Sequence, residues 1–84
     1  SKNPVAYNDA AICCIYSNDL KAAKEYLKSA YELDKSDMII LANLAYISED
    51  LGETEDAKKY YKLLEQSTDE QYSSMAKRKL ESLQ

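Results

Sequence analysis

The residue types that most often do chemistry are scarce in this chain of 84 residues, which contains no His and two Cys. The cysteines are adjacent, Cys13 and Cys14. Neighbouring side chains on a helix point about 100° apart, so this pair cannot form a disulfide without breaking the helix. We interpret both as small apolar packing residues in a reducing, cytoplasmic setting. The alternative, a redox or metal role, lacks a His and a second Cys pair to complete a zinc site.

Paired carboxylates are the next candidates, because two neighbouring acids can act as general acid and base. Asp19 with Glu25, and Glu49 with Asp50, lie near expected helix ends or exposed faces. Solvation and helix-dipole stabilisation account for them there. The sequence has no Gly-rich phosphate loop and no H-E-x-x-H pattern, and a Cys nucleophile would lack a His base. We therefore predict that the chain is not an enzyme and that it binds no cofactor and no metal.

The net charge limits the possible partners. It is formally −4, and an acidic chain repels phosphate backbones, so we predict no nucleic-acid partner. No apolar run reaches the roughly 20 residues of a membrane span, and the first residues lack the basic region and apolar core of a secretion signal. We expect a cytoplasmic chain, without membrane contact, whose partner is a peptide or protein surface, with a basic one favoured.

The composition predicts long helices joined by short turns. There is one Gly and one Pro, and the good helix formers Ala, Leu, Lys and Glu fill the segments between them. Apolar residues recur three or four positions apart, as on single-faced helices. We expect five helices at about 4–16, 19–33, 37–51, 54–65 and 69–83. Because the loops are short, consecutive helices should be antiparallel.

Capping residues mark the expected helix ends. Asn3 precedes a first-turn Pro and is a good N-cap, and Gly52 suits a left-handed residue after the third helix. Thr54 is expected to cap the fourth helix. Ser67-x-x-Glu70 fits a capping box that opens the fifth.

An internal repeat organises these helices. The motif A-K-x-Y-x-K occurs at 23–28 and again at 57–62, which gives a repeat period of about 34 residues. Positions 7–11 and 41–45 share the same offset, with a large residue followed one turn later by a small one. Small residues at helix crossings permit close approach. The expected close contacts are Ala11, Ala23, Ala45 and Ala57.

This pattern resembles the tetratricopeptide repeat (TPR) family, whose helix–turn–helix unit has the same period. The positions that carry the resemblance in the first repeat are Tyr7, Ala10, Ala11, Cys14, Ala23, Leu27 and Ala30. Those in the second are Leu41, Leu44, Ala45, Ser48, Gly52, Ala57, Tyr61 and Leu64. The match runs from residue 4 to about 68 and has departures: Lys35 replaces the turn Pro, Tyr7 and Leu41 stand for Trp, and Leu64 stands for Ala. A helical-hairpin array outside the family is the alternative.

The resemblance implies an all-α fold, a right-handed superhelix of helical hairpins. We expect one TPR-like domain over 1–84, with repeat one at about 4–37, repeat two at about 38–68 and a capping helix at about 69–83, cut from a longer array. The fifth helix has a second interpretation. Its Tyr72-x-x-Met75-Ala76 resembles Leu41-x-x-Leu44-Ala45, so it could be the first helix of a third repeat. We favour the cap, because its outer face is strongly charged.

TPR arrays bind ligands on a concave face lined by the first helix of each repeat. The matching positions here are Val5, Asn8, Asp9, Ile12, Tyr16, Ile39, Ala42, Asn43 and Tyr46. Aliphatic, aromatic and amide groups together suit an extended peptide, since amides fix its backbone and apolar groups contact its side chains. The simpler interpretation of Val5, Ile12 and Ile39 is packing against a neighbouring repeat.

Some TPR domains bind chaperone tails through a carboxylate clamp of Lys and Asn side chains. Asn43 falls at one clamp position, but Asn8 stands where Lys is needed and Ile12 where Asn is needed. Lys77 would approach the last basic position only if a third repeat kept the period of the first two. A clamp neutralises a carboxylate mainly with paired cations, so we do not expect one here.

The first helix is apolar on nearly every side and therefore needs neighbours on every side. We infer an unsatisfied face that could receive a preceding repeat, a second copy or a ligand. The sequence thus predicts a protein–protein interaction or scaffold module that binds a peptide or protein segment on the concave face. The alternative is a homo-oligomerisation module that uses the apolar face of the first helix.

Overall fold

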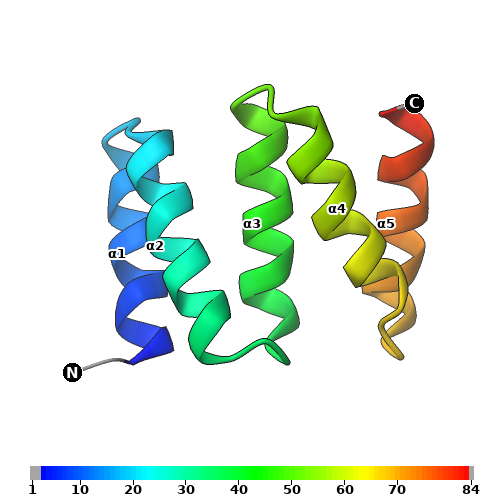
Figure 1. Ribbon diagram of the computed structural model, residues 1–84, viewed down its shortest axis with the longest axis horizontal. Coiled ribbons are helices and arrows are strands. Elements are labelled where there is room, and N and C mark those ends of the chain that lie inside the picture. The colour runs from blue at the N-terminus through cyan, green and yellow to red at the C-terminus, as the bar shows by residue number, and fades with distance from the viewer. Residues whose placement is uncertain (1–2, 84) are drawn as a thin grey trace.

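The computed structural model describes residues 3–83, so residues 1, 2 and 84 of the expected domain lie outside the described part. It consists of helices α1 (Pro4–Tyr16), α2 (Leu20–Leu33), α3 (Met38–Asp50), α4 (Thr54–Glu65) and α5 (Glu70–Ser82). The helices stand side by side in chain order, and each is antiparallel to the next (Figure 1). Within the described residues the fold is all-α, as the composition predicts.

Two of the short turns share one hydrogen-bonding pattern. After α1, the Asp19 N–H donates to the Cys14 carbonyl at 2.7 Å; after α3, the Glu53 N–H donates to the Ser48 carbonyl at 2.9 Å. Each pattern needs a left-handed residue just past the helix end, and Asn18 (φ 63°) and Gly52 (φ 76°) supply it. Gly52 was expected; Asn18, one repeat period earlier, is its counterpart in the first repeat.

Of the three N-caps expected above, Asn3 is present and the other two are corrected. Asn3 Oδ1 accepts a hydrogen bond from the N–H two residues on, at 2.9 Å. The predictions for the fourth and fifth helices were wrong. Glu53, not Thr54, precedes α4, and its carboxylate contacts Lys24 instead of the helix backbone.

The helix α5 starts from Asp69, whose Oδ1 accepts from the Gln71 N–H at 2.9 Å. The expected capping box of Ser67 and Glu70 does not form. Ser67 Oγ instead accepts from the Asp69 N–H at 3.0 Å and so fixes the capping residue itself. An Asp next to the helix competes better for its first N–H groups, because its carboxylate also meets the positive end of the helix dipole.

Small residues form the helix crossings. The four expected contact residues, Ala11, Ala23, Ala45 and Ala57, are all completely buried. Large side chains, among them Leu27, Leu41, Leu44, Tyr61 and Leu64, fill the space beside them. The alternation of small and large residues therefore allows neighbouring helices to approach closely without voids.

The helix α5 packs against α4 with a register different from that of the repeat. Ala76 is completely buried, and it follows Ala45 by three positions fewer than the repeat period requires. The shift arises largely because α4 has 12 residues where α2 has 14. Tyr72, Met75 and Leu80 are partly buried against the same core.

The close packing at the helix crossings can be tested with a larger side chain at one of the buried alanines. We expect Ala45→Leu to lower the free energy of unfolding by about 1–3 kcal/mol, because the larger side chain has no space at a crossing that is already filled. Thermal or urea unfolding followed by circular dichroism measures this. Ala6→Leu is the matched control, since Ala6 is exposed on α1, and it should change stability by less than about 0.5 kcal/mol. Equal effects at the two positions would contradict close packing at Ala45.

Candidate functional site

The candidate site is the exposed surface of α1 and α3, which we call the α1–α3 surface. Its members among the expected residues are Val5, Asn8, Asp9, Ile12, Tyr16, Ile39, Asn43 and Tyr46. Val5 is 64% exposed, Ile39 58% and Tyr16 87%, although each is large and apolar or aromatic. Large side chains of this kind, left accessible to solvent on helices of one array, are typical of a surface that contacts another protein.

A side-chain amide pair joins the two helices in the middle of this surface. Asn43 Nδ2 donates to Asn8 Oδ1 over a long hydrogen bond of 3.5 Å. Both side chains are half-buried, and each retains further donor and acceptor capacity. The pair can therefore hydrogen-bond the backbone of an extended segment while apolar groups on both sides contact its side chains.

One expected residue does not belong to the surface. Ala42 is 4% exposed and forms part of the hydrophobic core, so it cannot contact a ligand. The repeat pattern placed it on the same face as Asn43, but a step of one residue on a helix turns the side chain by about 100°. That rotation is enough to move Ala42 from the accessible face to the packed one.

Of the residues weighed for a carboxylate clamp, Asn8 and Asn43 lie together, whereas Lys77 lines a different part of the molecule. Asn43 is engaged with Asn8. Lys77 would be in reach only if the repeat period were kept, whereas α5 packs with a shorter offset. Its side chain instead lines a cavity with Lys58 and Lys62 on α4.

A network of aromatic and polar contacts lies beneath Tyr46 of the α1–α3 surface. The ring of Tyr46 meets the buried Tyr61 edge-on, with centroids 6.3 Å apart. The Tyr61 hydroxyl donates to Glu49 Oε1 at 2.7 Å, and Lys79 Nζ lies 3.4 Å from the same oxygen. Burial, and then the hydrogen bond to Glu49, raise the pKa of Tyr61, so its hydroxyl remains a proton donor. This network of contacts holds the Tyr46 ring in place and links α3 to α5.

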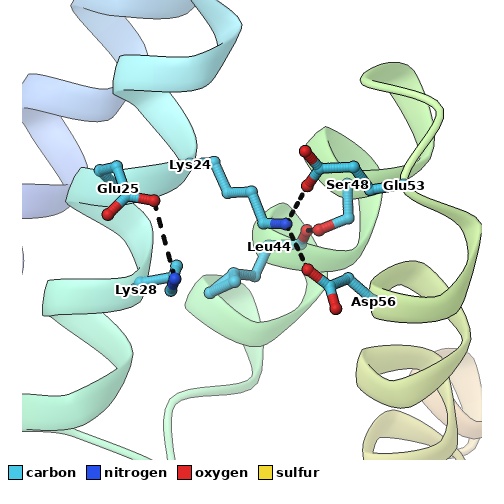
Figure 2. A network of polar contacts seen from close by, with 7 residues as sticks. All are labelled: Lys24, Glu25, Lys28, Leu44, Ser48, Glu53 and Asp56. Atoms are coloured by element: carbon cyan, nitrogen blue, oxygen red, sulfur yellow. Dashed lines mark hydrogen bonds and ion pairs between the residues drawn. The ribbon is translucent and has the colours of Figure 1, made fainter.

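The most buried charge among residues 3–83 belongs to Lys24. Lys24 extends from α2 toward the start of α4, where its Nζ contacts the carboxylates of Glu53 and Asp56 (Figure 2). The distance to Asp56 Oδ2 is 2.6 Å, and Lys24 is 6% exposed. Sequence reasoning counted this Lys only as part of the A-K-x-Y-x-K motif. Its position between the buried Ala23 and Leu27 is the signal that could have revealed its burial.

The two charges of this contact shift each other's pKa. Burial by itself lowers the pKa of Lys24, but the hydrogen bonds and charges of Asp56 and Glu53 outweigh it, and the pKa is raised above 10.5. The hydrogen bond from Lys24 is the main cause that lowers the pKa of Asp56 below 3.8. Both groups therefore stay ionised at neutral pH.

Within residues 3–83, no helix is both long enough and apolar enough to cross a membrane. The same part of the chain contains no cluster of three or more His, Cys, Asp or Glu side chains arranged to hold a metal ion.

A comparison with known protein families shows to which family the chain belongs. The family model of the coatomer epsilon subunit matches residues 1–82, which is nearly the whole chain. The chain belongs to this family. Comparison with curated proteins and with solved structures gives no significant match. The coatomer epsilon family is a TPR-like family of helical repeats, so the TPR resemblance is compatible with this match but coarser than it. The chain is a helical protein-interaction module of a family of complex subunits.

In this coatomer epsilon family member, Lys24 should stabilise the fold through its stem as much as through its charge. We expect Lys24→Ala to lower the free energy of unfolding by about 1–2 kcal/mol, because packing and ion pairs are both lost. Lys24→Met keeps a stem of similar length, and Glu53 and Asp56 remain about half exposed to water. That change should cost less than about 1 kcal/mol. Urea unfolding of both variants provides the test, and a larger loss for Lys24→Met would contradict the packing role.

The pH dependence of stability should report the pair of Asp56 with Lys24. The folded pKa of Asp56 is lowered, so its contribution is present above its ordinary pKa of 3.8 and disappears as the pH falls through the folded value. We expect Asp56→Asn to be less stable than the natural chain at pH 7, by up to about 1 kcal/mol because the side chain is half exposed. The difference should vanish in acid. Unfolding midpoints measured from pH 7 down to about 2 show this, and a difference that stays constant would contradict it.

Proposed function

We propose that this chain holds a segment of another coatomer subunit on its α1–α3 surface and acts as a scaffold without catalysis. The observation that carries the proposal is the row of exposed apolar side chains on α1 and α3 beside the amide pair of Asn8 and Asn43. The family adds support, because a subunit works through contacts with other subunits. We place this function in the cytoplasm. We expect no nucleic acid, membrane or cofactor as a direct ligand.

The chemistry of the surface suggests how such a segment would bind. Val5 and Ile39 supply aliphatic contacts, Tyr46 supplies an aromatic one, and the two amides can pair with peptide groups. The support beneath Tyr46 fixes its ring in place, so less side-chain entropy is lost on binding. The segment would be extended and partly apolar. The net charge of −4 favours one with basic residues.

A binding experiment with matched variants tests the proposal. The other coatomer subunits, purified one at a time, are titrated into the chain in a calorimeter. We expect one to bind, and we expect Ile39→Asp to weaken that binding about 10-fold or more, since it places a charge in the apolar contact. Leu63→Asp is the control, because Leu63 is also exposed and apolar but lies on α4, outside the surface. Equal loss in both variants, or none in either, would show that the α1–α3 surface is not the binding site.

The alternative of homo-oligomerisation rests on one further observation. Ile15, near the end of α1, is 42% exposed and lies outside the α1–α3 surface, next to the exposed Tyr16 that belongs to it. A second copy or preceding repeats could cover them. Light scattering coupled to size exclusion separates the possibilities. A dimer that dissociates on Ile15→Asp would support self-association, whereas a monomer at the highest accessible concentration would contradict it.

A further inference from the structure

The charged side chains are divided unequally between the helices. Helices α1 and α3 contain no Lys or Arg, whereas α2, α4 and α5 contain three basic residues each. The acids of α1 and α3 are Asp9, Glu49 and Asp50. Glu49 is held by Tyr61 and Lys79, but Asp9 and Asp50 are exposed. The charges that these two helices present to a partner are therefore negative.

Asp50 extends the α1–α3 surface by one turn. It continues the row of Ile39, Asn43 and Tyr46, whose steps of four, three and four residues keep the row on one face of α3. On α1, the residue one repeat period earlier is Tyr16. Since α1 and α3 run parallel to each other (Figure 1), their last turns bring an aromatic ring and a carboxylate to the same end of the surface.

This end of the surface attracts cations by more than the carboxylate itself. A helix carries a partial negative charge at its C-terminus, which basic side chains commonly offset. Neither α1 nor α3 has a basic residue in its last turn. The N-terminus of α2 lies at the same end, but Asp19 caps it. The dipole of α3 therefore disfavours the charge of Asp50, and a cation supplied by a partner relieves both.

The other exposed acid lies beside the amide pair. Asp9 precedes Asn43 by one repeat period, so it has on α1 the place that Asn43 has on α3. The Asn43 Nδ2 donates to Asn8, which leaves the Asn43 Oδ1 as an acceptor. Among residues 3–83, no Lys or Arg nitrogen lies within 4.0 Å of a carboxylate oxygen of Asp9 or Asp50. Two separate places on the surface therefore offer acceptors to a cation.

The separation of the two acids sets the spacing of the cations that can meet them. Tyr16, the α1 counterpart of Asp50, lies seven residues beyond Asp9, which is about 10 Å along the helix axis. Neighbouring helices lie about 8–10 Å apart, so the diagonal from α1 to α3 is about 13–14 Å. Four residues of an extended chain span about 13 Å, and alternate side chains share one face. Basic residues at i and i+4 of an extended segment therefore reach both acids.

The residue midway along such a segment meets an apolar part of the surface. Ile12 and Tyr46 correspond to each other in the two repeats and lie between the levels of Asp9 and Asp50. They are 39% and 40% exposed. An aliphatic or aromatic side chain at i+2 can therefore be buried against both of them.

We propose that the α1–α3 surface selects an extended segment of its partner in which a basic, an apolar and a second basic residue occupy positions i, i+2 and i+4. The basic side chains pair with Asp9 and Asp50, and the apolar one packs on Ile12 and Tyr46. Arginine is favoured over lysine at Asp50, because its planar group binds the carboxylate and stacks on the 87% exposed ring of Tyr16. This inference rests on the function proposed above, and it makes the two acids the residues that determine specificity.

A second folded copy of the chain does not present this segment. The spacing of Lys, Tyr and Lys at i, i+2 and i+4 does occur, at 24–28 and at 58–62. Both stretches lie within helices, α2 and α4. Side chains four residues apart on a helix are only about 6 Å apart, which is less than half the separation needed. The occupant is therefore a segment of another protein.

The test uses two capped peptides that differ only in charge. The first contains Arg-x-Leu-x-Arg in a flexible chain rich in Gly and Ser, and in the second Gln replaces both arginines. Each is titrated into the isotope-labelled chain. We expect the first peptide to shift the backbone amide signals of Asn8, Asn43 and Tyr46 in NMR spectra, and the second to bind at least about fivefold more weakly.

A matched pair of variants assigns one of the acids. Asp50→Asn should weaken binding of the Arg peptide about fivefold and leave that of the Gln peptide within about twofold. Glu81→Gln is the control, since it removes the same charge from an exposed acid in the last turn of α5, outside the surface. It should leave both affinities within about twofold. Loss of an acid from the last turn of a helix favours the helix, so both variants fold, and thermal unfolding verifies this.

The possible failures are distinguishable. Equal shifts with the two peptides would overturn the selection of basic residues and leave the α1–α3 surface as a binding site. Equal losses for Asp50→Asn and Glu81→Gln would overturn the role of Asp50. If neither peptide binds but a purified subunit does, and Ile39→Asp weakens that binding, the alternating pattern is wrong and the proposed function stands. If neither the peptides nor any subunit binds, both are wrong.

Discussion

The structure depends on close contact between helices at four alanines. A single helical hairpin cannot bury both sides of its helices, so each hairpin relies on the next for its apolar contacts. The completely buried Ala11, Ala23, Ala45 and Ala57 allow that approach, and the large side chains beside them complete the core. Packing is mainly between consecutive helices, and the array is held by a sequence of similar interfaces rather than by one central core.

The periodic features of the chain were predictable because they repeat. The helix-forming composition, the spacing of the repeats and the small residues each indicated the same fold, and the helices lie within a few residues of their expected bounds. Most of the α1–α3 surface could also be named in advance, because helix periodicity sets which residues share a face. Ala42 is the exception and shows the limit of predictions from periodicity. It lies at the edge of the expected helix face, where a shift of one position separates an exposed residue from a buried one.

Other features arise from pairs of residues that are distant in sequence. Lys24 is buried only because Glu53 and Asp56, on another helix, meet its charge, and that same contact removes Glu53 from its role as a cap. Competition of this kind follows from tertiary structure, so local capping rules could not reveal it. The register of α5 is similar: it depends on where α4 ends, and the sequence pattern alone allowed either a full repeat period or a shortened one.

Three polar contacts each connect a helix to the next but one: Asn8 with Asn43, Lys24 with Glu53 and Asp56, and Glu49 with Lys79. Contacts of this kind limit how far alternate helices can move relative to one another. Two of them are ionic and partly open to water, so salt weakens them while leaving the alanine crossings intact. Added salt should therefore weaken the coupling between alternate helices more than it weakens the packing of consecutive ones.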